Sequence, residues 1–163
     1  MLEEKAVEEQ FVRVSSFEGF YNQSWSKVYR AVAVLTRDWD LASEAVDEAM
    51  VRAFENWKSV SHMSNPEGWV YRVAVNWARS RLRRRSLWRK LSPGSSVIHD
   101  PEVADPVTVD AVRSLPAGQR EVVVLRFLLD MSEADTAEAL GIPKGTVKSR
   151  LNRALASLRE ELS

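Results

Sequence analysis

The stretch that decides the fold lies near the C-terminus: residues 141–162, GIPKGTVKSRLNRALASLREEL. Gly141 is suited to end one helix and Pro143 to open the next, so the sequence predicts a short turn between two helices. On a helical wheel, the apolar residues of the second helix fall in one arc of about 100°. They are Val147, Leu151, Ala154, Leu155, Leu158 and Leu162. We expect this arc to pack against the preceding helices.

The opposite side of the same helix is polar and basic. It carries Thr146, Ser149, Asn152 and Arg153, with Lys148 and Arg150 on its flanks. Donors in the first turns of such a helix can reach base edges in the major groove, while the flanking cations meet phosphates. The pattern predicts the second helix of a helix-turn-helix that reads duplex DNA. The alternative is an amphipathic helix with a solvated face that closes a small bundle.

Two further helices are predicted before this motif. The segment REVVVLRFLL, 120–129, has a Val run typical of a strand. We predict a helix instead, because Pro116 stands where a helix would start and no partner strand is evident. The segment MSEADTAEALG, 131–141, follows, and in it Ser132 with Asp135 resembles a capping box.

Helical patterns also fill the N-terminal part of the chain. Apolar residues recur at helical spacing from Phe17 to Val32, and Asp40 is predicted to cap a second helix. The polar segment KSVSHMSN, 58–65, is predicted to be a loop. Asn65 followed by Pro66 then opens a third helix, which ends in the basic run ARSRLRRRSLWRK, 78–90.

Between these two parts, the segment LSPGSSVIHDPEVADP, 91–106, has three Pro, one Gly and three Ser and reads as a linker. We therefore predict an all-α protein of two small helical domains. A domain over residues 1–90 is joined by a flexible linker over 91–110 to a helix-turn-helix domain over 111–163.

Charge is segregated along the chain, although the formal net charge is zero. Residues 58–90 carry 9 basic and 1 acidic side chains, and residues 143–163 carry 5 and 2. The rest of the chain is acidic. Because local blocks set the field that a partner meets, two basic blocks predict two contacts with a polyanion.

The basic third helix is the second candidate site. Its cations are interleaved with tryptophans: Arg72, Arg79, Arg81, Arg83, Arg84, Arg85, Arg89 and Lys90 lie among Trp77 and Trp88. Cations attract phosphate, and aromatic rings can stack on unpaired bases. The alternative for Trp69 and Trp77 is core packing, and Trp88 could be either. The polar loop before this helix could hold an unstacked base or be an ordinary connection.

Several classes of function are not expected. The chain has no Cys, which excludes disulfides and thiolate metal sites and fits a reducing compartment. The start, MLEEKAVEEQ, does not resemble a signal peptide, and the apolar runs are too short for membrane insertion. His62 and His99 have no carboxylates at ligand spacing, and no Gly loop could cradle phosphate. We therefore expect no metal, no cofactor and no enzyme activity.

The residues also resemble a family, the extracytoplasmic-function (ECF) sigma factors of bacterial RNA polymerase. Residues 114–162 are similar to region 4, with LP and R at Leu115, Pro116 and Arg120, AEALG at 137–141 and GTVKSRL at 145–151. The stretch from Phe17 to Arg85 is similar to region 2. In it, LASEAVDEAMVRAFENW, 41–57, resembles the helix that binds core polymerase, and PEGWVYRVAVNWARSRLRRR, 66–85, resembles the promoter-melting helix.

The resemblance implies a sigma factor that directs promoter recognition, promoter melting and transcription initiation. Its partners would be core RNA polymerase, through the clamp and flap regions, and promoter DNA, both duplex and single-stranded. An anti-sigma factor is also implied, as is a place in the bacterial cytoplasm, at the nucleoid when bound to polymerase. The alternative is a helix-turn-helix regulator that binds duplex DNA without polymerase.

The resemblance also implies roles for individual residues. Core polymerase would contact Glu44, Asp47, Glu48 and Arg52. The minus-ten element and its melted strands would contact Ser61, His62, Asn65, Trp69, Arg72, Asn76, Arg79 and Arg83. The minus-thirty-five element would contact Thr146, Lys148, Ser149, Arg150, Asn152 and Arg153. Thr136 stands where the family has Ile or Val, and we expect this to loosen the first helix of the motif.

Overall fold

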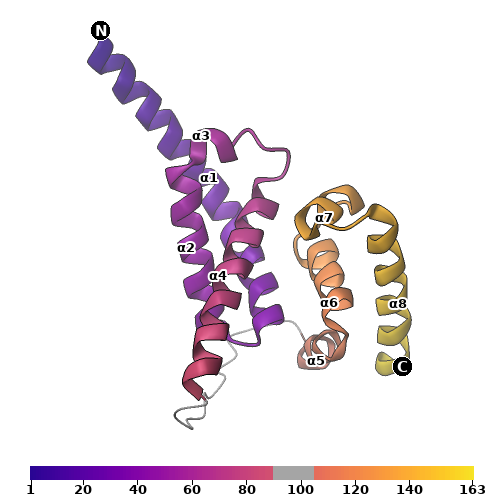
Figure 1. Ribbon diagram of the computed structural model, residues 1–163. Coiled ribbons are helices and arrows are strands. Elements are labelled where there is room, and N and C mark those ends of the chain that lie inside the picture. Colours follow the sequence, from indigo (N-terminus) through magenta and orange to yellow (C-terminus); the bar gives the residue numbers. More distant parts are fainter. Residues whose placement is uncertain (90–104) are drawn as a thin grey trace.

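The computed structural model describes residues 1–89 and 105–163, and every regular element in these ranges is a helix. Figure 1 shows two helical units side by side: an N-terminal unit of α1–α4 and a C-terminal unit of α5–α8. The predicted all-α fold is therefore confirmed.

Three long helices build the N-terminal unit: α1 (Leu2–Thr36), α2 (Trp39–Glu55) and α4 (Pro66–Arg89). The side of α2 that faces its neighbours carries small buried residues, Ala42, Ala45, Ala49 and Ala53. Because these positions are three or four apart, they form one stripe, and their small side chains let α1 and α4 approach closely.

The N-cap of α2 is Asp38 and not Asp40, so that prediction was wrong. Asp38 has an extended backbone, and its Oδ1 accepts a hydrogen bond from the backbone N–H of Leu41 at 2.9 Å. Asp40 lies within the first turn of the helix. Its charge there still suits the positive end of the helix dipole.

The segment expected to be a loop is partly helical. Residues 57–60 form α3 (Trp57–Val60), and only the residues from Ser61 to Asn65 connect it to α4. Trp57 and Val60 are buried, and the ring of Trp57 lies 5.4 Å from that of Phe17. This apolar anchor draws the first residues of the segment into a helical turn.

The predicted start of α4 is confirmed. The Asn65 Oδ1 accepts a hydrogen bond from the backbone N–H of Gly68 at 3.0 Å, and Pro66 is the first helical residue. A Cβ on Gly68 would come within 2.5 Å of the Asn65 amide nitrogen. Only glycine therefore leaves room for this cap.

The N-terminal part of α1 projects beyond the bundle (Figure 1). Its side chains are exposed, including those of Leu2, Val7 and Phe11. Val7 and Phe11 continue the helical spacing of apolar residues toward the N-terminus, but the structure leaves both side chains exposed.

The C-terminal unit consists of α5 (Pro106–Ser114), α6 (Ala117–Val123), the π-helical turn η1 (Val124–Leu128), α7 (Glu133–Leu140) and α8 (Lys144–Leu162). Asp105 caps α5, because its Oδ1 accepts a hydrogen bond from the N–H of Val107 at 3.3 Å. Helix α5 thus begins inside the span expected to be linker. Residues 90–104 of that span lie outside the described residues.

The Val run is helical, as predicted, although its last turn is wider than an α-helix. The N–H of Leu129 donates to the carbonyl of Val124 at 3.3 Å, five residues back. Val122 packs with Val147, Val123 packs with Ala154, and Val124 and Leu125 pack against the N-terminal unit. Because Val122, Val123, Val124 and Leu125 are buried in three different clusters, tertiary packing outweighs the β-propensity of the Val run.

The helix-turn-helix has its predicted caps. The Ser132 Oγ accepts a hydrogen bond from the N–H of Asp135 at 3.0 Å, and Gly141 ends α7 in the left-handed conformation with φ of 63°. Val147 and Ala154 of α8 are buried, as predicted. Leu162 is 46% exposed, so its predicted packing was wrong: it is the last residue of α8, and no further turn of that helix shields it.

Candidate nucleic-acid and polymerase interfaces

Five of the predicted minus-ten residues share one side of α4. At 100° per residue, they fall within an arc of about 80°. We call this set the α4 stripe: Trp69, Arg72, Asn76, Arg79 and Arg83. Its four polar side chains are exposed, and Trp69 is half-buried against the core. The stripe offers cations in a line next to one aromatic ring.

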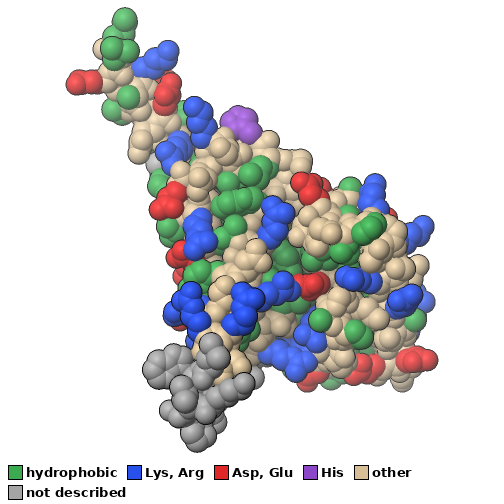
Figure 2. Space-filling view, in the orientation of Figure 1, with side chains coloured by type: hydrophobic (Ala, Val, Ile, Leu, Met, Phe, Trp, Pro, Cys, Tyr) green, Lys and Arg blue, Asp and Glu red, His purple; other side chains and the backbone are tan. Residues whose placement is uncertain are grey.

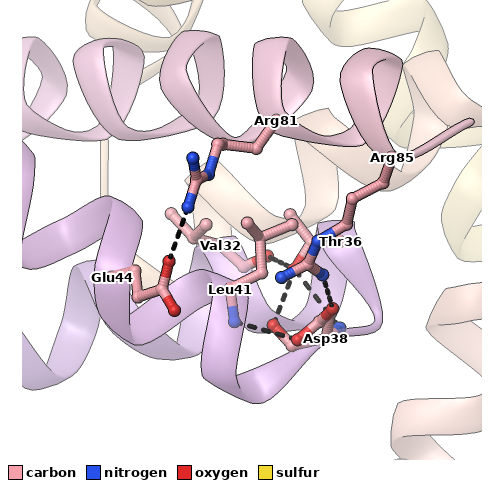
Figure 3. Close-up of polar contacts among 7 residues, drawn as sticks. All are labelled: Val32, Thr36, Asp38, Leu41, Glu44, Arg81 and Arg85. Atoms are coloured by element: carbon pink, nitrogen blue, oxygen red, sulfur yellow. Dashed lines mark hydrogen bonds and ion pairs between the residues drawn. The ribbon is translucent and has the colours of Figure 1, made fainter. Parts of the chain in front are cut away.

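Two further arginines of α4, Arg81 and Arg85, contact the bundle. Arg81 Nη2 lies 3.7 Å from Glu44 Oε2, and Arg85 Nη1 lies 2.7 Å from Asp38 Oδ2. Figure 3 shows both reaching from α4 to α2. The Arg81 guanidinium also lies 5.2 Å from the ring of Trp77, which is half-buried against the core. Core packing is thus the role of Trp77.

The basic run of α4 therefore has two sides. Arg81 and Arg85 pair with carboxylates of the bundle, whereas the cations of the α4 stripe lie on an exposed side. The side chains of Trp88 and Arg89, together with Lys90 and His99, lie outside the described residues.

The loop before α4 sends its side chains to two different places. Asn65 lines a recess of about 350 Å³ together with Ser64, Gly68, Trp69 and Arg72. Ser61 and His62 line a separate groove beside α1. The His62 Nδ1 lies 2.6 Å from the Lys58 carbonyl, to which it donates. The structure thus joins Asn65, but neither Ser61 nor His62, to the α4 stripe.

The predicted polymerase-binding residues share the outer side of α2. Asp47 Oδ1 accepts a hydrogen bond from Trp25 Nε1 at 2.8 Å, and Glu48 Oε1 pairs with Arg52 Nε at 3.0 Å. Val51 is 54% exposed, and at 100° per residue its position lies between those of Asp47 and Glu48.

Sequence reasoning missed Val51. Its signal was an apolar residue four positions after Asp47 on an otherwise charged side. An exposed apolar side chain ringed by charges suits a protein partner better than a nucleic acid.

On α8, the structure keeps most of the predicted duplex-reading residues together. Lys148, Ser149, Asn152 and Arg153 are exposed, and Thr146 is half-buried. Arg150 is half-buried because its guanidinium lies over α6, where a Cβ on Gly118 would come within 2.9 Å of its Nη1. Arg150 thus has a packing role in addition to its charge.

An apolar groove of about 590 Å³ lies on the C-terminal unit, and sequence reasoning missed it. Its walls come from α5, α6, η1 and α8, with α1 at one edge: Arg30, Val34, Thr108, Val109, Val112, Val123, Val124, Phe127, Leu128, Leu155 and Leu158. Phe127 is 60% exposed. Exposed apolar surface of this kind is typical of protein-binding sites.

Within residues 1–89 and 105–163, no group of three or more His, Asp or Glu side chains could hold a metal ion. No helix in these ranges is long and apolar enough to cross a membrane.

Comparisons with known proteins match both units. The family model "Sigma-70 region 2" matches residues 20–87, and "Sigma-70, region 4" matches residues 108–158. The RNA polymerase sigma-E factor of Streptomyces avermitilis is 34% identical over 154 residues, which cover 91% of this chain and 86% of that protein.

A second relative is the ECF RNA polymerase sigma factor SigM of Mycobacterium tuberculosis. It is 31% identical over 151 residues, which cover 88% of this chain and 75% of that protein. Among solved structures, the sigma factor RpoE of Bartonella quintana, in complex with the anti-sigma factor NepR, superposes with a TM-score of 0.76. It is 24% identical, and the match covers 90% of this chain and 96% of that one.

Proposed function

Because the chain belongs to the extracytoplasmic-function sigma factors of bacterial RNA polymerase, we propose that its separate surfaces divide promoter melting, promoter recognition and polymerase binding among them. As a sigma factor, it directs transcription initiation with core polymerase and binds promoter DNA. The family matches favour this function over a regulator that acts without polymerase. Our assignment of promoter melting to the N-terminal unit rests on one observation: the residues of the α4 stripe all lie on one side of α4.

The α4 stripe is the proposed site for the melted strand of the minus-ten element. Arg72, Arg79 and Arg83 repeat along one side of the helix, so successive phosphates of an extended strand can meet successive cations. Trp69 borders the recess near Asn65 and offers a ring face on which an unpaired base can stack. Ser61 and His62 would contact the melted strand only if that strand also passes through the groove beside α1.

Helix α8 is the proposed reader of the minus-thirty-five element. Lys148, Ser149, Asn152 and Arg153 are exposed in its first turns, which is the part of a recognition helix that enters the major groove. We assign Arg153 to base edges, because a guanidinium can donate two hydrogen bonds to guanine. Thr146 and Arg150 lie at the border of this surface.

The outer side of α2 is the proposed contact with the polymerase clamp. Its acidic residues Glu44, Asp47 and Glu48, with Arg52, surround the exposed Val51. This combination gives charge complementarity around an apolar centre. The apolar groove with Phe127 is the proposed contact with the flap region, because it is the large apolar surface on the C-terminal unit that the DNA-reading side of α8 does not use.

We further propose that the chain is a binding protein without enzyme activity and that polymerase catalyses the reaction. We also propose that the chain acts in the bacterial cytoplasm. Because RpoE was solved with an anti-sigma factor, we propose such a partner for this chain as well.

The test is promoter melting by the full chain with core polymerase, on promoters selected by run-off transcription from genomic DNA. Unpaired thymines are detected by permanganate. We expect strong melting with polymerase and none without it. Arg72→Ala should lower melting, whereas Arg84→Ala, on the same helix but outside the stripe, should not. Equal effects of the two substitutions would overturn the assignment of the stripe.

A further inference from the structure

The N-terminal part of α1 forms an arm that projects beyond the bundle (Figure 1). All side chains of residues 2–12 are exposed, and we call these residues the arm. The family model for region 2 begins only at residue 20. The arm therefore lies outside the part of the chain that this model matches, and its own residues indicate its role.

The arm has two sides of different character. Glu9 and Val12 line the groove beside α1, which has a volume of about 890 Å³. At 100° per residue, Val7 and Phe11 lie about 140° and 100° away from Val12. Both are exposed, Val7 to 69% and Phe11 to 72%. The arm thus presents a second, apolar side that does not face the groove.

This apolar side continues along α1 to the proposed clamp surface on α2. Four residues of α1 fall within an arc of about 80° and span about 27 Å of the helix axis: Val7, Phe11, Tyr21 and Trp25. Tyr21 is exposed, and Trp25 Nε1 donates to Asp47 Oδ1 at 2.8 Å. Because Asp47 belongs to the outer side of α2, a partner that binds there also meets this side of α1.

The direction of the arm is fixed by contacts at its base. Arg13 Nη2 donates to the carbonyl of Phe54, near the end of α2, at 2.6 Å. The Arg13 guanidinium also lies 5.1 Å from the centre of the Phe54 ring, against which the ring of Phe17 packs edge-on. A cation beside the last carbonyls of a helix is favourable. Helix α1 is therefore held against α2 next to the arm, which keeps its orientation relative to the clamp surface.

The charge of the arm indicates the kind of partner. It carries four Glu and one Lys, and Figure 2 shows acidic side chains beside exposed hydrophobic ones on it. Glu4 and Glu8 lie about 20° and 60° from Phe11 around the helix. Acidic side chains repel DNA phosphates, and they also repel a second copy of the same arm. An apolar centre with an acidic border suits a basic protein surface.

We propose that the arm extends the polymerase contact, and that Val7 and Phe11 bind an apolar, basic segment of core polymerase next to the segment that binds α2. The proposal rests on the assignment of the outer side of α2 to the clamp. Glu4 and Glu8 pair with cations of that segment. The arm contributes binding energy in the holoenzyme, because its exposed apolar side chains leave water there.

The first experiment measures the affinity of the labelled full chain for core polymerase by fluorescence anisotropy. We expect Phe11→Ala to lower this affinity about tenfold and Val7→Ala to lower it about threefold. Val12→Ala removes the same atoms as Val7→Ala, from a valine that is 60% exposed on the groove side, and should leave the affinity unchanged. Equal losses from the two valine variants would overturn the proposal.

The same assay tests the charge of the arm. Glu4→Lys should lower the affinity about fivefold at low salt, because it places a cation beside the basic segment. Glu9→Lys makes the same change on the groove side, about 160° from Phe11, and should have a much smaller effect. Equal losses would show a general effect of net charge and would contradict the proposed contact.

Hydrogen–deuterium exchange of the full chain identifies what covers the arm. We expect rapid exchange of the amides of residues 2–12 in the free chain and slow exchange in the holoenzyme. Protection that appears in the free chain as its concentration rises would indicate a second copy, and protection by promoter DNA without polymerase would indicate a nucleic acid. Either result, or rapid exchange in the holoenzyme, would overturn the proposal.

The two proposals fail differently. If Val51→Ala leaves the affinity for core polymerase unchanged, the assignment of the outer side of α2 fails, and the arm loses the contact that it extends. If Val51→Ala lowers this affinity but Phe11→Ala does not, the clamp assignment stands and the arm has no part in it.

Discussion

Asp38 and Arg85 join the start of α2 to the basic end of α4. One carboxylate oxygen of Asp38 accepts the N–H of Leu41 at 2.9 Å, and the other pairs with Arg85 at 2.7 Å (Figure 3). The same side chain therefore caps one helix and fixes the rotation of another. This contact, with that of Arg81 to Glu44, fixes the side of α4 that faces α2 and leaves Arg72, Arg79 and Arg83 of the stripe on another side.

Asp38→Ala should lower the free energy of unfolding by about 1–2 kcal/mol, because it removes both the cap and the ion pair. Asp38→Asn keeps an oxygen for the cap and should cost about 0.5 kcal/mol, since Arg85 is partly exposed. Urea unfolding measures both, and Arg85→Ala is the control for the ion pair alone. Equal losses for Ala and Asn would show that the cap contributes little.

Thr136→Val should stabilise the protein by about 1 kcal/mol. Thr136 is 0% exposed, and its Oγ1 has no partner among the described residues, so its hydroxyl is desolvated without compensation. Thermal unfolding measures the change. The control is Thr108→Val, where the hydroxyl donates to Asp105 at 3.0 Å and its loss should not stabilise. A lower melting temperature for Thr136→Val would contradict this account.

Asn65 has a capping role that can be separated from any contact with DNA. Asn65→Ala should cost about 1 kcal/mol of stability, whereas Asn65→Asp keeps the acceptor for the Gly68 N–H and should cost much less. Denaturation in urea measures both. Permanganate footprinting of the same two variants with core polymerase then tests the base contact. If Asn65→Asp melts promoters normally, the residue serves as a cap alone.

Arg153→Ala should weaken selection of the upstream promoter element by about 1–3 kcal/mol and leave affinity for core polymerase unchanged. The matched control is Arg159→Ala, which removes an exposed cation from another side of the same helix. Competition between promoters with intact and scrambled upstream elements measures the effect. An equal loss of core binding would mean that Arg153 is structural.

Phe127→Ala should lower affinity for core polymerase by about tenfold or more, since aromatic side chains dominate such contacts. Stability should change little, because the ring is 60% exposed. Fluorescence anisotropy of the labelled chain with core polymerase measures the affinity. Val107→Ala, an exposed apolar residue outside the groove, is the control, and an equal effect there would remove the groove from the interface.

The parts of the fold that were predictable depend on residues a few positions apart. The caps at Asn65, Ser132 and Gly141 each involve neighbours within four or five residues, so the sequence contains their signal. The extent of α1 was not predicted, because the apolar side chains of its first turns stay exposed and no buried residue marks where the helix begins. The burial of Leu162 was misjudged because a wheel gives the direction of a side chain but not whether another element covers it.

The candidate site, too, was predictable only where it depends on residues close in the sequence. The spacing of Arg72, Asn76, Arg79 and Arg83 already places them on one side of a helix. The ion pairs of Arg81 and Arg85 with the bundle could not be predicted, because their partners Glu44 and Asp38 lie about forty positions earlier. The position of Glu121 over Arg79 depends on how the two units meet, which no local pattern encodes.

The π-helical turn at Val124–Leu128 has a consequence for insertions and deletions. The turn holds one residue more than an α-helix would. Deleting a single residue there would restore regular pitch and rotate everything downstream by about 100° relative to α6. Substitutions in this segment change the packing locally, whereas a change in its length would reorient α8, the proposed reader of duplex DNA, relative to α6.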